Sequence, residues 1–175
     1  MALLMLDLFA GLGGASQAMK ARGWDVVTVD NDPAFNCTVT ADLAGWSWAG
    51  RQPDLVWASP PCTEFSRDLL PWIKTDGPPS LALALAAKRI IEETAPQWWV
   101  VENVRGASKW FRPIFGPVVR ACGPFFLWGR FPHFHYRHGG KKKESWTSRA
   151  RADRAKVPAA LSLALARACE STLFV

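Results

Sequence analysis

Four short runs rich in apolar residues recur along the first two thirds of the chain. They cover Leu3 to Phe9, Asp25 to Asp30, Pro53 to Ser59 and Trp98 to Val104. Near-continuous apolar runs of this length are typical of strands that are buried on both faces of a sheet. We therefore predict four parallel strands from these runs.

Segments with the composition of helices alternate with the strands. Ala15 to Arg22 follows the first strand, Ser80 to Thr94 separates the third and fourth strands, and Ala159 to Glu170 lies near the end of the chain. A further strand is predicted at Phe125 to Gly129. Alternating strands and helices predict an α/β fold, a mostly parallel sheet with helices on both faces, and a ligand crevice at the carboxyl ends of the strands.

Length and composition are those of one ordinary globular domain, with 175 residues, 49% hydrophobic and 21% charged. We therefore expect a single domain over residues 1–175 and a monomer. The sequence has no apolar run of about 18 residues, and its first residues, MALLMLD, lack the basic start of a secretory signal. We expect a cytoplasmic protein that does not bind a membrane. The four cysteines form no CxxC pair, so neither a disulfide framework nor a bound metal is predicted.

The net charge of +6 is concentrated in one segment. Residues 130 to 156 contain nine Lys and Arg against two acidic residues, so the remainder of the chain is close to neutral. This basic loop, residues 130–157, is predicted to contact a polyanion, because basic segments attract polyanions. Its candidate phosphate-binding residues are Lys141, Lys142, Lys143, Arg149 and Arg151, and its aromatic residues Phe131, Phe134, Tyr136 and Trp146 offer stacking surfaces. The alternative is a solvated loop that only keeps the protein soluble.

Glycines and a carboxylate follow the first two predicted strands. The segment Phe9 to Gly14 is rich in glycine and opens a helix, so its backbone amides can approach a ligand closely. Asp30 ends the second strand about 20 residues later, where a carboxylate can accept hydrogen bonds from the hydroxyls of a ribose. Together they suggest a cofactor that contains adenosine. Asp42 is a further candidate for the adenine side or a solvated turn residue.

The next two strands end in residues that can carry out chemistry. Two prolines precede Cys62 directly after the third strand, and this rigid backbone could hold a nucleophile in place. Glu102 lies near the end of the fourth strand after a run of apolar residues, where burial would raise its pKa and let it carry a proton.

The order of these motifs resembles the DNA (cytosine-5)-methyltransferase family. The matching strings are Asp7-Leu-Phe-Ala-Gly-Leu-Gly-Gly14, Pro60-Pro-Cys62 with Phe65-Ser66, and Glu102-Asn-Val104. Compact phage-type members, which lack a target-recognition domain, also resemble the tail, in Leu127 to Pro132 and Val157 to Ser162. The resemblance implies a Rossmann-like fold that binds S-adenosylmethionine, and a target cytosine that is flipped out of DNA.

The resemblance also implies roles for individual residues. Cys62 would be the nucleophile and Glu102 would bind the cytosine. The residues that would lie at the cofactor are Asp7, Phe9, Gly11, Gly13, Gly14, Asp30, Asp42 and Pro60. Ser66 and Arg67, just after the nucleophile, would contact DNA.

The chain departs from the family pattern in two motifs and in the short stretch between Arg105 and Val157. The family's Gln-x-Arg-x-Arg string is absent, and Arg130 is the best substitute as a catalytic residue, or else a phosphate contact. Arg154-Ala-Lys-Val-Pro158 stands where the family typically has Gly-Asn-x-Val-Pro, so the asparagine is missing. The 53 residues from Arg105 to Val157 are too few for a separate recognition domain, so we expect methylation in a short sequence context.

Alternatives within and outside this chemistry remain open. An RNA cytosine-5 methyltransferase would share the mechanism, and an amino-directed DNA methyltransferase would share the fold but carry Tyr at the position of Cys62. A nicotinamide dehydrogenase would need a third glycine after Gly11-Leu-Gly-Gly14, which this chain lacks. A relative that binds DNA without turnover is the alternative that is not an enzyme.

Overall fold

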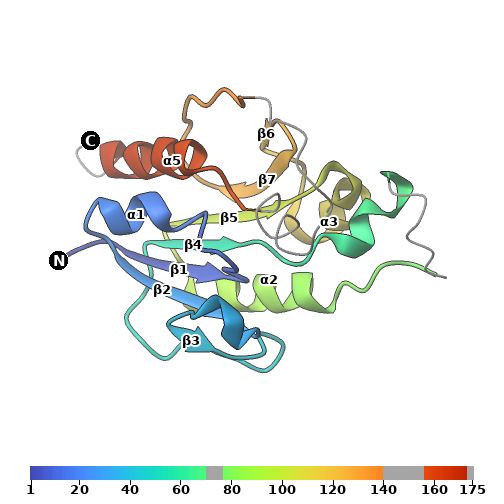
Figure 1. The fold of residues 1–175 in the computed structure, drawn as a ribbon, viewed down its shortest axis with the longest axis horizontal. Helices are drawn as coiled ribbons and strands as arrows, with labels where there is room; N and C mark the ends of the chain where they lie inside the picture. Colours follow the sequence, from blue (N-terminus) through green and yellow to red (C-terminus); the bar gives the residue numbers. More distant parts are fainter. Residues whose placement is uncertain (70–76, 140–155, 173–175) are drawn as a thin grey trace.

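The computed structural model describes residues 1–69, 77–139 and 156–172 (Figure 1). The strands of its sheet are β1 (Leu4–Leu8), β2 (Asp25–Asp30), β3 (Val39–Thr40), β4 (Leu55–Ala58), β5 (Trp98–Asn103), β6 (Arg120–Cys122) and β7 (Phe125–Arg130). The α-helices are α1 (Gln17–Ala21), α2 (Ala82–Thr94), α3 (Ser108–Phe115) and α5 (Ala159–Ser171). Three 3-10 helices complete the described elements: η1 (Pro33–Phe35), η2 (Thr63–Leu69) and η3 (Arg105–Ala107).

The strands form one seven-stranded sheet in the order β3-β2-β1-β4-β5-β7-β6. The first five strands in this order, β3, β2, β1, β4 and β5, are parallel to one another. Strand β7 runs antiparallel to β5 and forms a hairpin with β6. The carboxyl ends of β1, β2, β4 and β5 therefore lie along one edge of the sheet. The predicted class, an α/β fold with a mostly parallel sheet, is confirmed.

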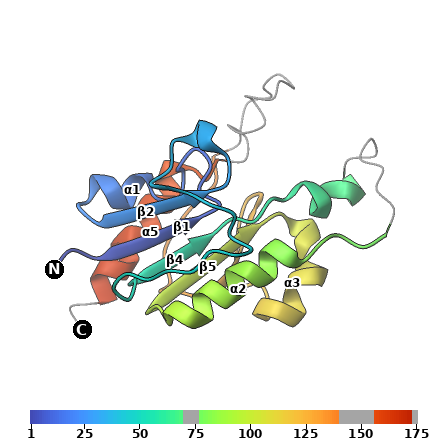
Figure 2. The same ribbon diagram turned by 90° about the horizontal axis from the view of Figure 1, so that it is seen from below.

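Each face of the sheet has its own hydrophobic core, because alternate residues of a strand point to opposite faces. On one face Met5 and Trp57 pack with residues of α1 and α5, including Leu161. On the other face Leu6 and Val56 pack in the cluster that contains residues of α2 and α3. Figures 1 and 2 show the resulting three layers, with α1 and α5 on one side of the sheet and α2 on the other.

The predicted elements agree with the structure to within two residues at their ends, and α1 is shortened at both. The helix predicted from Ala15 is regular only from Gln17 to Ala21, and the residues before it form turns. The short strands β3 and β6 and the helix α3 were not located from the sequence. The antiparallel direction of β7 matters for the site, because it sets the end of the sheet at which Arg130 lies.

No helix within the described ranges has both the length and the apolar character that a membrane-spanning helix requires.

Candidate active site

The turn after β1 has backbone angles that favour glycine. Phe9, Gly11 and Gly13 all have positive φ, at 58°, 50° and 67°. A Cβ atom at Gly11 would have no other atom within 4 Å, so the turn is open on that side. The turn thus presents backbone next to open space, as close approach of a ligand requires.

Asp30 fastens this turn to the end of β2. Its Oδ2 accepts a hydrogen bond from the Gly11 amide at 2.9 Å, and its Oδ1 accepts one from the Asp32 amide at 3.0 Å. The predicted neighbours Gly11 and Asp30 are therefore in direct contact. Asp30 is only 8% exposed, and these two hydrogen bonds to backbone amides stabilise the shape of the turn.

The tail of the chain packs against the same turn. A Cβ atom at Gly14 would lie 2.5 Å from the Val157 carbonyl oxygen, so a larger residue there would displace the tail. The buried hydroxyl of Ser162 donates to the Ala15 carbonyl and accepts from the Ala18 amide. The Val157 to Ser162 segment thus lies beside the turn despite its distance in sequence.

Asp7 is a buried carboxyl group inside β1. It is 1% exposed, and its Oδ2 has no hydrogen-bond partner among the described residues. Burial raises the pKa of Asp7 to about 7, and hydrogen bonds from Ser16 offset part of that increase. The sheet edge therefore holds a carboxyl group that can change its protonation state near neutral pH.

Asp42 begins an irregular segment directly after β3. The Ala41 amide donates to the Asp30 carbonyl at 2.9 Å, which brings the start of this segment next to the end of β2. Asp42 is exposed, and its Oδ1 accepts from the Ala44 amide at 3.0 Å. Asp42 and Asp30 thus lie along the same edge of the sheet.

Cys62 precedes the first turn of η2. Its carbonyl oxygen accepts from the Phe65 and Ser66 amides and from the Ser66 hydroxyl, the last at 3.0 Å. Helix η3 packs closely against this turn, since a Cβ atom at Gly106 would lie 1.9 Å from the Phe65 carbonyl oxygen. The backbone of the half-buried Cys62 is therefore held by contacts with η2, which itself packs on η3.

Asn103, the last residue of β5, ties the Pro-Pro-Cys segment to the sheet. Its side-chain amide donates to the Pro60 carbonyl at 2.9 Å, and its side-chain oxygen accepts from the Val104 amide at 2.9 Å. Pro60 is thus part of the scaffold of Cys62.

Glu102 lies on β5, next to the strand that leads to Cys62. It is 8% exposed, and burial raises its pKa to about 7, while a hydrogen bond from Ser59 lowers it. Ser59 also accepts from the Trp57 indole at 2.8 Å. Burial and the charge of Glu102 both raise the pKa of the Cys62 thiol. Glu102 is therefore close enough to Cys62 for its charge to act on the thiol, and β4 and β5, the strands that carry the two motifs, are neighbours in the sheet.

Arg130, the predicted substitute for a catalytic arginine, does not lie with Cys62 and Glu102. Because β7 is antiparallel, Arg130 pairs with Trp99 near the start of β5, about 10 Å along the strand from Glu102. Its guanidinium donates to the carbonyls of Pro96 and Gln97 at 2.7 and 3.1 Å. Arg130 therefore holds the turn before β5, at the opposite edge of the sheet.

The predicted DNA-contacting residues are mostly outside the described residues. This applies to Lys141, Lys142, Lys143, Arg149, Arg151 and Trp146, and to the side chain of Arg67. Of the aromatic residues proposed for stacking, Phe134 is only 3% exposed and packs in the core with the Arg120 guanidinium 4.5 Å from its ring. Phe134 is therefore unavailable for stacking on a base.

Two residues of the site were missed from the sequence. Ser59 and Asn103 both hold the catalytic candidates through side-chain hydrogen bonds across strands. Their position at strand ends, directly before and after residues that were identified, was the available signal. Only the pairing of β4 with β5 shows which partners they reach.

Comparison with known proteins identifies the family. Residues 3–110 match the family C-5 cytosine-specific DNA methylase, and this range is more than half of the chain. The chain belongs to that family. The fold is accordingly the Rossmann-like fold of S-adenosylmethionine-dependent methyltransferases, and the residues matched include both Cys62 and Glu102.

Individual relatives are similar over part of their length. The chain is 33% identical over 119 residues to a Frog virus 3 (isolate Goorha) protein named "Probable DNA (cytosine-5)-methyltransferase", covering 57% of this chain and 52% of the viral protein. The chain thus spans about half the length of this relative.

Two solved structures are also similar to the chain over part of their length. The E. coli protein titled "putative DNA modification methyltransferase encoded within prophage" is 23% identical, covers 74% of this chain and 47% of that chain, and has a TM-score of 0.49. The S. pombe Dnmt2 methyltransferase is 14% identical, covers 89% of this chain and 55% of that chain, and has a TM-score of 0.47.

Proposed function

We propose that this protein transfers a methyl group from S-adenosylmethionine to carbon 5 of cytosine in DNA, through a covalent adduct with Cys62. The observation that carries the proposal is the position of the buried Glu102 carboxyl group on β5, next to the strand that leads to Cys62, where its charge raises the pKa of the Cys62 thiol. A nucleophile beside an acid that is half protonated near neutral pH suits attack on a ring that must accept negative charge.

The residues at the ends of β1 and β2 fit the cofactor. S-adenosylmethionine, when bound, supplies an electrophilic methyl group on a sulfonium. The turn with positive φ at Gly11 and Gly13 offers open backbone for it, and Asp30 and Asp42 lie along the same edge for its ribose and adenine. The Oδ2 of Asp7, which has no hydrogen-bond partner among the residues that the structure describes, is a buried acceptor in the strand that leads into this turn.

Cys62 begins the reaction because cytosine alone is a poor nucleophile at carbon 5. The thiolate of Cys62 forms a bond to carbon 6, and the electron pair of the ring double bond moves toward nitrogen 3. This converts carbon 5 into an enamine carbon that can take the methyl group. When a base later removes the proton of carbon 5, the bond between carbon 6 and sulfur breaks and the Cys62 thiolate is released.

Glu102 holds a proton at nitrogen 3 during the addition. A pKa of about 7 leaves a substantial fraction of Glu102 protonated at neutral pH, so it can donate to the ring as charge arrives there. Protonation of Glu102 also removes the negative charge that raises the pKa of Cys62. The same proton therefore assists both the thiolate and the ring.

Trapping on DNA that contains 5-fluorocytosine at the target tests this chemistry. Fluorine cannot leave as a cation, so methylation should stop at the covalent adduct, which denaturing electrophoresis would detect. The adduct should require S-adenosylmethionine and should be absent in Cys62→Ala. Glu102→Gln should form it about 10²-fold more slowly, because one positioned donor to the developing charge is weakened.

Cys37→Ala is the matched control, because Cys37 is also a partly exposed free cysteine. It should form the adduct at the wild-type rate. An adduct that persists in Cys62→Ala, or methylation of an exocyclic nitrogen by the wild type, would refute the proposal. The same assay with an RNA strand of equal sequence distinguishes the two substrates, and exclusive trapping on RNA would refute the choice of DNA.

A further inference from the structure

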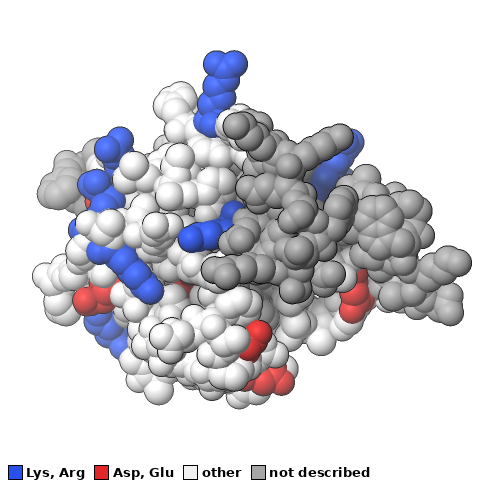
Figure 3. Space-filling view, viewed as in Figure 1, with Lys and Arg blue, Asp and Glu red and all other residues white. Residues whose placement is uncertain are grey.

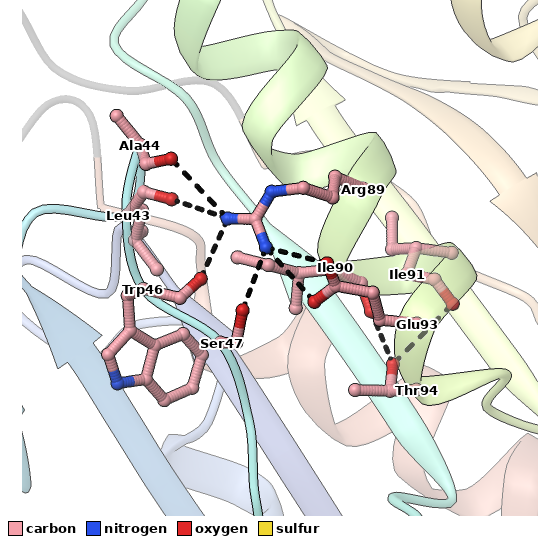
Figure 4. A network of polar contacts seen from close by, with 9 residues as sticks. All are labelled: Leu43, Ala44, Trp46, Ser47, Arg89, Ile90, Ile91, Glu93 and Thr94. Carbon is pink, nitrogen blue, oxygen red and sulfur yellow. Dashed lines mark hydrogen bonds and ion pairs between the residues drawn. The ribbon is translucent and has the colours of Figure 1, made fainter.

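Arg89 of α2 makes an unusual set of contacts with the segment after β3. Its Nη2 donates to the carbonyl oxygens of Leu43, Ala44 and Trp46 at 3.2, 3.5 and 2.7 Å. Its Nη1 donates to the Ser47 hydroxyl at 3.0 Å. Figure 4 shows the guanidinium pointing from the helix into the curve of this segment.

The carbonyl groups that accept hydrogen bonds from Arg89 lie outside regular secondary structure. Leu43, Ala44 and Trp46 lie in turns and irregular backbone, so no strand or helix pairs with their carbonyl groups. A charged donor to several such carbonyls defines the curve of the segment more strongly than neutral hydrogen bonds would. Glu93, one turn further along α2, accepts from Arg89 Nη1 at 2.8 and 3.0 Å and fixes the direction of the guanidinium.

This segment carries a candidate cofactor residue between two anchors. At its start the Ala41 amide donates to the Asp30 carbonyl, and Asp42 follows directly. Beyond Asp42, Leu43 is 2% exposed and packs in the core beside α2, and the Arg89 contacts begin at the Leu43 carbonyl. Asp42 therefore lies between the end of β2 and the Arg89 contacts.

We propose that Arg89 is a positioning residue for cofactor binding, which holds the Asp42 to Ser47 segment in the shape that receives the adenosine end of S-adenosylmethionine. The inference rests on the proposed function, since it takes that cofactor as the ligand. Arg89 itself touches neither cofactor nor substrate in this role. It acts through the backbone of the segment.

The role calls for arginine and not for positive charge alone. The planar guanidinium holds Nη1 and Nη2 at a fixed separation, so it bonds Glu93 and Ser47 on one side while Nη2 bonds the carbonyls. A lysine ammonium keeps the charge and the pair with Glu93 but has only one nitrogen. Arg89→Lys is therefore the decisive variant, and it preserves helix propensity as well.

The experiment measures binding of S-adenosylhomocysteine by calorimetry and hydrogen exchange of residues 42–47 in the full chain without DNA. In Arg89→Lys the affinity should fall about 10-fold, the equivalent of one hydrogen bond to a charged group. Exchange should accelerate in residues 42–47 but not in β1 or β5. In turnover assays the KM for S-adenosylmethionine should rise by a larger factor than kcat falls.

Two control variants separate this role from helix stability. Lys88→Ala and Glu92→Gln each remove one partner of the neighbouring ion pair on the same helix, and neither residue is among the contacts of Arg89. Both should bind S-adenosylhomocysteine within about twofold of the wild type, because exposed ion pairs contribute little.

Each outcome decides one question. Equal affinity in Arg89→Lys, Lys88→Ala and the wild type would overturn the role of Arg89 while leaving the proposed function intact. Exchange that accelerates throughout the sheet in Arg89→Lys would also overturn it, since the residue would then only stabilise the fold. A wild-type chain that binds no S-adenosylhomocysteine would instead refute the proposed function, and the cofactor role of Arg89 with it.

Discussion

The proposed catalytic role of Glu102 comes with a cost in stability. Its pKa is raised from 4.5 to about 7 by burial, so the folded chain retains a proton that the unfolded chain releases between these pH values. The free energy of unfolding should therefore fall as pH rises through that window and level off above about pH 7. In Glu102→Gln the part of this decrease that comes from Glu102 is absent, because the amide does not ionise.

Denaturant unfolding at pH 4 and pH 8 measures this difference. Relative to the wild type, Glu102→Gln should gain up to about 3 kcal/mol on going from the lower to the higher pH. The contribution of Asp7, whose pKa is raised in the same way, is present in both proteins and cancels. Glu92→Gln on the exposed side of α2 is the control and should show no such gain. A gain that is equal in both variants would contradict the burial of an ionisable Glu102.

At the scale of elements, the turn between β4 and η2 depends on its attachment to β5. Asn103→Asp retains the acceptor for the Val104 amide but loses the donor to the Pro60 carbonyl. Since a buried carbonyl left without its partner costs about 1–3 kcal/mol, the Cys62 segment should shift and adduct formation should slow by at least about 10-fold. S-adenosylhomocysteine binding should stay near the wild-type value.

Single-turnover trapping rates and calorimetric binding of S-adenosylhomocysteine, both measured on Asn103→Asp, test this prediction. Ser80→Ala, which changes a side chain bonded to the Ala82 amide at the start of α2, serves as the control and should leave both values unchanged. A normal trapping rate in Asn103→Asp would mean that η2 and η3 alone position Cys62.

The strands that could be predicted from the sequence are those with continuous apolar runs. β1, β2, β4, β5 and β7 lie within or close to the predicted ranges, because burial on both faces leaves a signal at every position. β3 and β6 have only two and three residues, too few for any periodicity. Such strands exist because a neighbouring strand offers hydrogen-bond partners, which is a tertiary effect.

The site could be predicted as far as strand direction was known. Cys62 follows β4, and Glu102 lies near the carboxyl end of β5. Because the carboxyl ends of parallel strands lie at the same edge of a sheet, the proximity of the two residues could be inferred. Arg130 also ends a strand, but a hydrophobic pattern carries no direction, and the antiparallel β7 brings Arg130 to the opposite edge. The links made by Ser59 and Asn103 required the register of β4 against β5.

Over the whole molecule, positive charge is concentrated in the basic loop, and the rest of the chain has little net charge. On the face in Figure 3 the coloured Lys and Arg side chains are spread out and do not form one patch. Most of the basic residues of 130–156 lie outside the described ranges, and the remaining chain is close to neutral by sequence. Attraction to DNA should therefore depend on that loop more than on the folded surface.

Replacement of Lys141, Lys142 and Lys143 by alanine tests this dependence. If each lysine neutralises one phosphate, the slope of log affinity for duplex DNA against log salt should decrease by up to about 0.9 per lost contact, and affinity at low salt should fall. Fluorescence anisotropy over a range of salt concentrations measures both. Binding of S-adenosylhomocysteine should be unchanged, and Lys88→Ala on α2 should keep the wild-type slope because its ammonium already pairs with Glu92. An unaltered slope in the triple variant would mean that the basic loop is only solvated surface and that DNA is held by the sheet edge alone.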